Sequence, residues 1–587
     1  MTGAGHRAVF TCNGAAVDVA VADGESLLSV LRERLGITSV KDGCAPQGQC
    51  GCCTVLVDGE PRVSCVTPVA RVVGRAVSTI EGLDAVVRSE IVDGLCATGG
   101  SQCGFCTPGI VVRAASMRAR GKTSPADLDR ALAAHLCRCT GWQTITDALS
   151  ATAVPQPEPA SKTREMDAFL TPERDEGAAA QRAELEGGVA QRVGADVARG
   201  LGGFADDLAP RDALVAVPLP PGSDAESVEA AGVRWVVADS LLDARAFAAK
   251  VQGRRTTVES APPLVLPARP AGGVRLATSW VEPAYLEPDA SWCDPGGEPA
   301  SPLANGGAFG GKDASPVARA ARELADATGR TVRSVFSRED VVRLGPKRAP
   351  IAASAVVDGD CVVINGVVAG DVAAYRDAAI ALPYALTVDA TWNEQSVMGP
   401  AVRAHDRFVL ADHAVLVEGA IDMAGLDRLA IVRDARGAAV VLDTCAQSTS
   451  GALAGARVHL DARGAVEGVE VRVAAGDPLD EVVLRSYVIG ATHMALGWVL
   501  TEAITVDPDT GEVFDLTIRS FGVIRARATP QIGVTIVDDA GPPRASASDA
   551  AFAAVAAATW NAIAKHEGAR PEQFPARDTP AARALRN

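Results

Sequence analysis

Apolar, β-forming residues gather in two short runs near the start of the chain, residues 8–12 and 16–21. The pair Asn13-Gly14 between them suits the positive φ values of a tight hairpin turn. Leucines then follow at helical spacing, at positions 27, 28, 31 and 35, with Ser26 placed to cap a helix and Gly36 to end it. The pattern predicts a hairpin followed by one amphipathic helix.

A second pair of strand-like runs, residues 54–57 and 61–65, surrounds Asp58-Gly59 and follows a loop rich in Gly and Cys. Hairpin, helix, loop and hairpin together predict a small β-grasp domain. From about residue 80 the pattern turns helical. Thr107-Pro108 can start a helix that stops near residue 121, and Ser124-Pro125 can start the next. These signals predict a helical bundle.

Residues 154–190 are rich in Pro, Glu, Ala and Arg with weak apolar periodicity, which indicates a surface linker. At 587 residues the chain is too long for one hydrophobic core. We expect an α+β multidomain protein: a β-grasp domain at 1–79, a helical domain at 80–153, the linker at 154–190, and two mixed α/β regions at 191–348 and 349–587.

The net charge and the length of the apolar stretches limit which kinds of partner this protein can have. The net charge of −16 repels phosphate backbones, and no stretch interleaves Lys or Arg with aromatic residues. We therefore expect no nucleic-acid partner. Residues 1–21 lack an export signal, and apolar stretches such as 550–558 fall short of the roughly 20 residues that a membrane helix needs. We expect a soluble, cytoplasmic protein without a membrane segment.

The cysteines are concentrated at the front, since eleven of the 14 precede residue 140. In a reducing compartment such a concentration indicates metal ligands or catalytic groups rather than disulfides. The plant-type ferredoxin spacing, C-x4-C-x2-C with a distant fourth Cys, is matched with one extra residue in the first gap by Cys44, Cys50, Cys53 and Cys65. Cys52 is left over: it is either a small buried residue or a competitor of Cys53. A zinc site is the alternative, and it explains neither the Gly-rich loop nor the β-grasp context.

A second group pairs C-x2-C with C-x-C: Cys103, Cys106, Cys137 and Cys139. The first two lie just before Pro108, near a helix N-terminus whose dipole favours a thiolate. The other two lie between predicted helices. A lone C-x2-C also occurs in redox and zinc motifs, but C-x2-C paired with C-x-C beside a ferredoxin-type domain is a specific signal for a second cluster. Cys12 and Cys96 have no partner spacing, and we expect both in the hydrophobic core.

Three motifs carry a resemblance to a known family: residues 41–53 (KDGCAPQGQCGCC), 102–109 (QCGFCTPG) and 137–141 (CRCTG). In these the chain closely resembles the xanthine dehydrogenase and aldehyde oxidoreductase family of molybdenum hydroxylases. The resemblance implies two [2Fe-2S] clusters, an outer one in the β-grasp domain and an inner one beside the pterin of a molybdenum cofactor. It also places Gln102 and Cys139 at that pterin, and mixed α/β molybdopterin-binding-like domains in the rest of the chain.

The later motifs match the family less closely. Residues 285–288 (YLEP) and 306–312 (GGAFGGK) are similar to segments that lead to and line the cofactor, so Phe309 and Gly310 are implied to contact it. Aligning residues 560–563 with the family's corresponding helix places Asp549 where the family has an essential Glu that acts as base. The family's Lys-Gly-x-Gly run before that position is absent, and the molybdenum portion is shortened.

Two function hypotheses follow. In the first, the chain is a hydroxylase of an aldehyde or N-heterocycle, with Asp549 as base and electrons leaving through both clusters. In the second, it is an electron-transfer or scaffold subunit with intact clusters and a non-catalytic molybdenum region. A zinc-binding structural protein is a third hypothesis. Because residues 154–190 cannot hold a flavin domain, we expect a separate electron donor or acceptor, a flavoprotein subunit or soluble carrier, within an oligomer or complex. The first hypothesis adds a small-molecule substrate.

Overall fold

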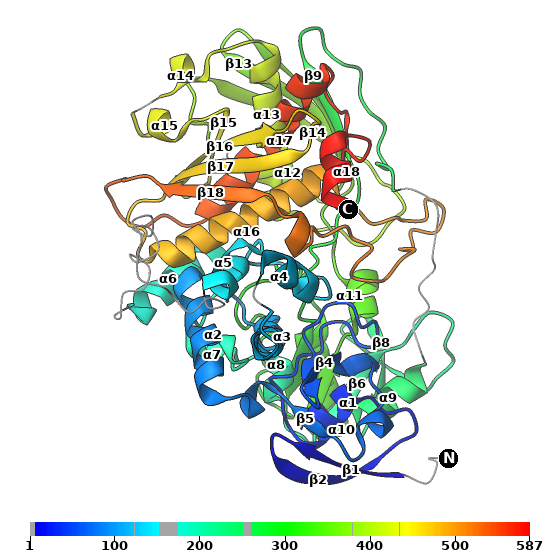
Figure 1. Ribbon diagram of the computed structural model, residues 1–587. Helices are drawn as coiled ribbons and strands as arrows, with labels where there is room; N and C mark the ends of the chain where they lie inside the picture. The colour runs from blue at the N-terminus through cyan, green and yellow to red at the C-terminus, as the bar shows by residue number, and fades with distance from the viewer. Residues whose placement is uncertain are drawn as a thin grey trace, which may run out of the picture.

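The computed structural model describes residues 6–122, 124–151, 174–249, 260–378, 380–433 and 435–586. The N-terminal strands lie at one end of the molecule beside green segments from the middle of the chain, and the yellow to red C-terminal part forms the other end (Figure 1). Blue and cyan helices lie between the two ends. The loop between Cys44 and Cys50 is hydrogen-bonded to residues hundreds of positions away, since Gln47 contacts Glu339 and Ile518.

The N-terminal sheet has the predicted hairpin and β-grasp arrangement. Its five strands run in the order β2 (Ala15–Val21), β1 (His6–Cys12), β5 (Ala76–Ser78), β3 (Thr54–Val57) and β4 (Glu60–Val63). Asn13 and Gly14 take φ values of 52° and 81° at the predicted turn. The expected helix is split into α1 (Leu27–Ser29) and a π-helical turn η1 (Val30–Arg34), and its buried leucines pack on the sheet.

The second part is helical, as predicted. It contains α2 (Ala85–Thr98), α3 (Thr107–Ala119), α4 (Pro125–Leu132) and α5 (Gln143–Ala151). Pro108 lies in the first turn of α3, where its missing N–H costs nothing. Ser124 and Asp127 form a reciprocal capping box at α4. These local signals explain why both helix starts were predictable.

A second five-stranded sheet is built around β6 (Leu214–Pro218), β8 (Val233–Ala238) and β11 (Val332–Val335), with β7 (Val228–Ala230) and β10 (Ala290–Cys293) at its edges. Alternate residues of β6 face opposite sides. Leu214 and Ala216 pack with α10 (Val317–Thr328), and Val215 and Val217 pack with α9 (Leu241–Ala248). Both faces are thus covered by helices.

The C-terminal part holds two further sheets. One has the order β14 (Thr387–Glu394), β13 (Cys361–Val368), β12 (Ile351–Asp358), β9 (Val274–Thr278) and β19 (Gln573–Phe574), and the other runs from β15 (Thr444–Gln447) through β16 (Leu453–Leu460) and β17 (Val466–Ala474) to β18 (Gln531–Ile536). Two long helices, α13 (Asp406–Met423) and α16 (Glu481–Leu500), pack on a third, α17 (Ala547–Glu567), and all three contact these sheets.

The helix α16 corrects one expectation, because its 20 residues are long and apolar enough to cross a membrane by length and composition. Yet 83% of its apolar window is buried inside the protein, where it packs on α17 and β18. A buried helix is apolar all round because every face meets other core residues. We interpret α16 as a core helix.

The predicted linker at 154–190 also needs correction. Its part up to residue 173 lies outside the described residues, but α6 (Glu176–Gly187) is a regular helix capped by Asp175 and ended by Gly188. Ala179 and Ala183 of α6 are buried against Val483 of α16. Because the buried residues of α6 are small alanines, the sequence shows only a weak helical period of apolar residues. The packing of α6 on α16 reveals that this stretch is structured.

Candidate metal centres

The four cysteines predicted for the outer group lie together and are buried. The Cys44 thiol is in hydrogen-bond contact with the thiols of Cys50 and Cys65, and these contacts hold its pKa well below the ordinary value. The Cys65 thiol also contacts that of Cys53. The backbone N–H groups of Gln49 and Cys50 both donate to the Cys44 sulfur at 3.3 Å. The loop therefore turns its backbone donors toward a thiol, as an iron–sulfur loop does.

Cys52 lies at the edge of this group. Its thiol contacts the Cys50 thiol and lies 3.9 Å from the Cys50 carbonyl oxygen. Cys53 instead accepts a hydrogen bond from the backbone N–H of Cys65 at 3.5 Å. Of the two adjacent cysteines, Cys53 is the one that the structure places beside Cys65.

The inner group is also brought together. The sulfur atoms of Cys103 and Cys139 lie 3.5 Å apart, and the thiols of Cys106 and Cys137 are in hydrogen-bond contact. Cys106 is the residue that precedes α3, so its thiol lies at the helix N-terminus as the sequence indicated. That contact with Cys106, together with Thr140, whose hydroxyl lies 3.1 Å from the Cys137 sulfur, lowers the pKa of Cys137 to about 7.

The outer thiols contact one another in the order Cys50, Cys44, Cys65, Cys53, and the inner thiols meet as two pairs. Within the described part of the chain, no group of three or more His, Cys, Asp or Glu side chains could hold a single metal ion. A structural zinc needs four ligands around one ion, whereas four cysteines hold the two irons of a [2Fe-2S] cluster. Each group of four cysteine thiols matches the ligand number of a [2Fe-2S] cluster.

The two groups are in direct backbone contact. The N–H of Leu136, next to Cys137, donates to the Cys50 carbonyl at 2.9 Å. On α3, a Cβ added at Gly109 would lie 2.5 Å from the Gly51 carbonyl oxygen and 2.9 Å from that of Cys52. Only a glycine at position 109 lets α3 approach the outer loop this closely. The backbone that carries the inner cysteines is therefore in direct contact with the backbone of the outer loop.

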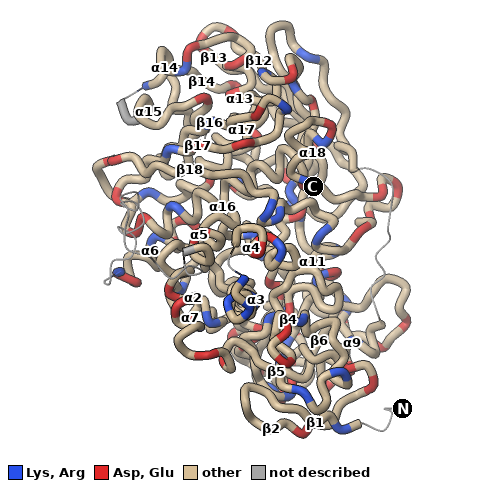
Figure 2. Tube along the Cα trace, viewed as in Figure 1, with Lys and Arg blue, Asp and Glu red and all other residues tan. Residues whose placement is uncertain are grey.

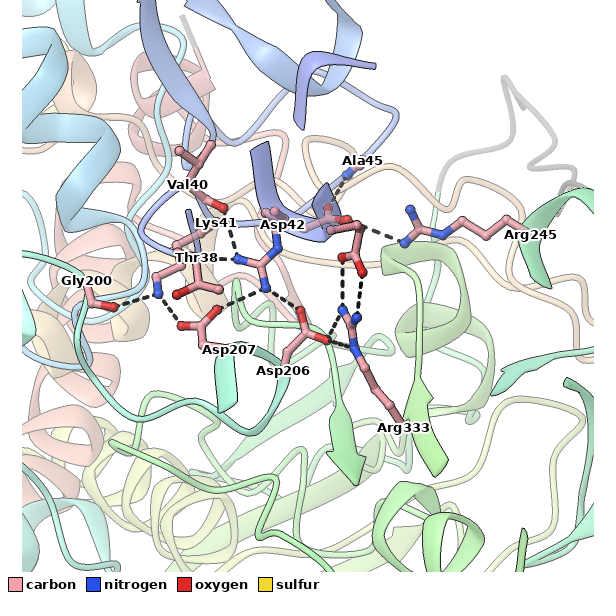
Figure 3. A network of polar contacts seen from close by, with 12 residues as sticks. Thr38, Val40, Lys41, Asp42, Ala45, Gly200, Asp206, Asp207, Arg245 and Arg333 are labelled. Carbon is pink, nitrogen blue, oxygen red and sulfur yellow. Dashed lines mark hydrogen bonds and ion pairs between the residues drawn. The ribbon is translucent and has the colours of Figure 1, made fainter. Parts of the chain in front are cut away.

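A buried polar network anchors the loop that leads to Cys44 (Figure 3). Arg32 donates to Asp206 at 2.7 Å and to Asp207 at 3.0 Å, and Arg333 bridges Asp206 and Glu33. Lys41, which is fully buried, donates to the carbonyl of Gly200 at 2.7 Å and to the Asp207 carboxylate. Basic and acidic residues are intermixed along the whole trace (Figure 2), and the members of this network come from residues 32–41, 200–207 and 333.

The charges of this network depend on each other. Burial disfavours the Asp206 carboxylate, but Arg333 and Arg32 outweigh it and hold the pKa of Asp206 below the ordinary value. Burial also lowers the pKa of Lys41, which Asp207 opposes. Removing one member would leave a partner charged, buried and unpaired, which typically costs about 3–5 kcal/mol. The network therefore holds the outer cysteine loop firmly on the middle part of the chain.

The glycine-rich loop at 306–312 lies directly against the inner cysteines. A Cβ at Gly307 would lie 3.2 Å from the sulfur atoms of both Cys103 and Cys139. The cavity between loop and thiols has a volume of about 10 Å³, which is about the space of one water molecule. It is also lined by Glu287 and Lys312, which form a buried ion pair at 2.7 Å.

Gln102, expected at the pterin, uses its amide N–H groups within the protein. Its Nε2 donates to the Cys139 carbonyl at 3.1 Å and to the Ser486 hydroxyl at 2.8 Å. With this amide engaged and only about 10 Å³ between the glycine-rich loop and Cys139, a pterin-type molybdenum cofactor does not fit in that cavity. Each group of four thiols, by contrast, offers the number of ligands that a [2Fe-2S] cluster needs.

Asp549 lies at the start of α17 and forms a buried ion pair with Arg407. The Arg407 guanidinium lies 5.9 Å from the centre of the Phe309 ring, and a Cβ at Gly310 would meet His405 at 2.5 Å. The structure therefore brings Asp549 and the Phe309–Gly310 loop into one neighbourhood, and it places the Arg407 guanidinium, which the sequence did not predict, on the Asp549 carboxylate.

Two contacts of the cysteine loops were not predictable from spacing. Arg138, between Cys137 and Cys139, donates both terminal nitrogens to the Glu502 carboxylate at 2.5 and 2.7 Å. Arg519 donates to the Gln49 carbonyl beside Cys50. No local signal marks partners that lie so far apart in the sequence.

Comparison with known proteins agrees with this geometry. The model of the [2Fe-2S] binding domain family matches residues 79–150. The xanthine dehydrogenase iron-sulfur-binding subunit of Escherichia coli O157:H7 is 39% identical over 141 residues, which are 23% of this chain and 87% of that protein. The aldehyde oxidoreductase of Megalodesulfovibrio gigas is 41% identical over 147 residues, which are 24% of this chain and 16% of that protein.

The fold of the whole chain is similar to a solved aldehyde oxidoreductase from Desulfovibrio gigas, with a TM-score of 0.73 at 16% identity, covering 99% of this chain and 100% of that chain. This likeness shows the mixed multidomain fold. The chain belongs to the xanthine dehydrogenase and aldehyde oxidoreductase family, the molybdenum hydroxylases. These are oxidoreductases with [2Fe-2S] clusters and a molybdopterin-type molybdenum cofactor, so the predicted family, enzyme class and cofactor type are confirmed at the level of the family.

Proposed function

We propose that this chain carries electrons through two [2Fe-2S] clusters as the iron–sulfur component of a molybdenum hydroxylase-type oxidoreductase. The observation that carries the proposal is the meeting of eight thiols in two groups of four whose backbones are in direct contact. When bound, each cluster supplies a one-electron redox centre. The ligands in this proposal are Cys44, Cys50, Cys53 and Cys65 in residues 1–79, and Cys103, Cys106, Cys137 and Cys139 in residues 80–153.

The protein holds the two cysteine groups close together and shields their thiols from solvent. Every one of these thiols except Cys103 is buried, so water and soluble oxidants are largely kept away from the ligands. The Leu136 to Cys50 hydrogen bond and the contact at Gly109 keep the two groups close. Short separation matters because electron transfer between centres needs orbital overlap through the intervening atoms. The β-grasp group is proposed as the outer relay.

The electron partner is proposed to be a separate protein, a flavoprotein subunit or soluble carrier, in a complex in the cytoplasm. Several relatives are named as subunits, among them the nicotine 6-hydroxylase small subunit of Paenarthrobacter nicotinovorans, 38% identical over 138 residues. The division into an iron–sulfur part and other components in those proteins supports this choice.

The test is a metal analysis of the anaerobically purified chain together with two cysteine variants. We expect four irons per chain and two distinct electron paramagnetic resonance (EPR) signals on reduction. Cys106→Ser should remove the inner signal and leave the outer one. Cys361→Ser, at a cysteine far from both groups in the sequence, should change neither. Zinc in place of iron would overturn the proposal.

Hydroxylation of an aldehyde or N-heterocycle is the second candidate. It is favoured by the approach of Asp549 and Phe309 to the same arginine, Arg407. It also needs a cofactor for which the cavity beside Cys103 and Cys139 has no room, and a base that is free of its ion pair. Molybdenum in stoichiometric amount, with substrate oxidation lost in Asp549→Asn, would establish this candidate. Four irons without molybdenum would leave the relay as the function.

A further inference from the structure

A segment from the C-terminal part of the chain lies across the outer cysteine loop. Gln47 donates from Nε2 to the Leu516 carbonyl at 3.2 Å and accepts from the backbone N–H of Ile518 at 3.1 Å. The backbone N–H of Arg519 donates to the Gln49 side-chain oxygen at 3.2 Å. Residues 516–519 are thus tied to residues 47–49, the stretch between Cys44 and Cys50.

The Arg519 side chain adds a charged contact to the same loop. Its Nε and one terminal nitrogen donate to the Gln49 carbonyl at 3.3 and 3.1 Å, and that terminal nitrogen also reaches the Ala133 carbonyl at 3.2 Å. The Ala133 contact links the guanidinium to the end of α4, in the helical part. The guanidinium is therefore held in place from two sides, with its forked donors on one carbonyl.

The Gln49 carbonyl and the Cys50 N–H belong to one peptide group. A peptide group is planar, so the direction of its oxygen determines the direction of its hydrogen. That Cys50 N–H donates to the Cys44 sulfur at 3.3 Å. By binding the oxygen end, Arg519 both aims and polarises the N–H end at a predicted cluster ligand. Its positive charge also lies in the field of Cys44 and Cys50.

We propose that Arg519 is a positioning residue that raises the reduction potential of the outer cluster, acting through the Gln49–Cys50 peptide. The inference rests on the proposed function, because it requires a cluster on Cys44, Cys50, Cys53 and Cys65. Reduction adds one negative charge to the cluster. Hydrogen bonds to the sulfurs and a nearby cation stabilise that charge, and both are levers on cluster potential. Arg519 thereby favours electron flow from the inner to the outer cluster.

The experiment is an EPR-monitored redox titration of the full-length chain, purified anaerobically. Arg519→Gln removes both the positive charge and the pair of guanidinium donors on the Gln49 carbonyl. Arg519→Lys keeps the charge but not the pair of donors. Arg525→Gln is the matched control. It removes an exposed arginine of the same stretch of chain, and among the described contacts the Arg525 side chain has no hydrogen bond to residues 44–53. Iron content is measured for each variant.

In Arg519→Gln we expect the equilibrium constant for electron transfer from inner to outer cluster to fall about tenfold, which is about 59 mV for a one-electron couple. The inner potential should stay unchanged. The outer potential of Arg519→Lys should fall between those of the wild type and Arg519→Gln. Arg525→Gln should change it less than Arg519→Gln does, because it removes a charge but no hydrogen bond to the Gln49 carbonyl. If Arg519→Gln loses the outer cluster, Arg519→Lys decides: a lowered outer potential supports the proposal and an unchanged one overturns it.

An outer potential that is unchanged in Arg519→Gln with full iron content would also overturn the inference. Failure of the proposed function looks different, because then the wild-type chain itself would lack one or both EPR signals. The two failures are therefore distinguishable in a single set of titrations.

Discussion

Replacing Gly109 by Ala tests whether the close approach of the two thiol groups is a property of the backbone. The added Cβ would lie 2.5 Å from the Gly51 oxygen and 2.9 Å from the Cys52 oxygen. Both obstacles are main-chain atoms, so no side-chain rotation can relieve them. Overpacking of this kind costs about 1–3 kcal/mol, while Ala in a helix gains at most about 1 kcal/mol over Gly. The clash should outweigh the gain, so the free energy of unfolding should fall by up to about 2 kcal/mol.

The assay is anaerobic urea unfolding followed by circular dichroism, with the rate of electron exchange between the clusters as a second measurement. We expect a lower free energy of unfolding and slower exchange, because α3 must move away from the outer loop. Gly177→Ala is the control, since its Cβ would meet only the Asp175 side chain, at 3.1 Å. A Gly109→Ala variant as stable as the wild type, with unchanged exchange, would refute the reasoning.

Two further substitutions probe buried charges. Glu502→Gln should lower the free energy of unfolding by about 3 kcal/mol, because it leaves Arg138 buried without its carboxylate; calorimetry should show no such loss for the exposed Glu567→Gln. Burial raises the pKa of Glu287 to about 7 despite the charge of Lys312. The folded protein then binds an extra proton between about pH 4.5 and 7, so stability should fall by roughly 3 kcal/mol as the pH rises through that range. Glu287→Gln should remove that part of the slope, and an unchanged slope would contradict the assignment.

Several elements were predictable because their signals are local. The Asn13-Gly14 hairpin, the start of α3 at Pro108 and the cap of α4 at Ser124 each depend on neighbours within four residues. The helix α6 was missed because its buried face is made of alanines. Alanine is only weakly apolar, so these residues do not produce a clear helical period of apolar positions. The split of the first helix at Val30 also has no signal in the spacing of its leucines.

The cysteine spacing by itself determined which thiols could act together, since a loop or a helix turn brings residues a few positions apart within reach. The tertiary structure decided what surrounds them. It placed Gly307 on the inner sulfurs, Glu502 on Arg138 and Arg519 on the Gln49 carbonyl. These contacts join residues that are far apart in sequence, and only the packing of whole elements, driven by burial of their apolar faces, brings such residues together.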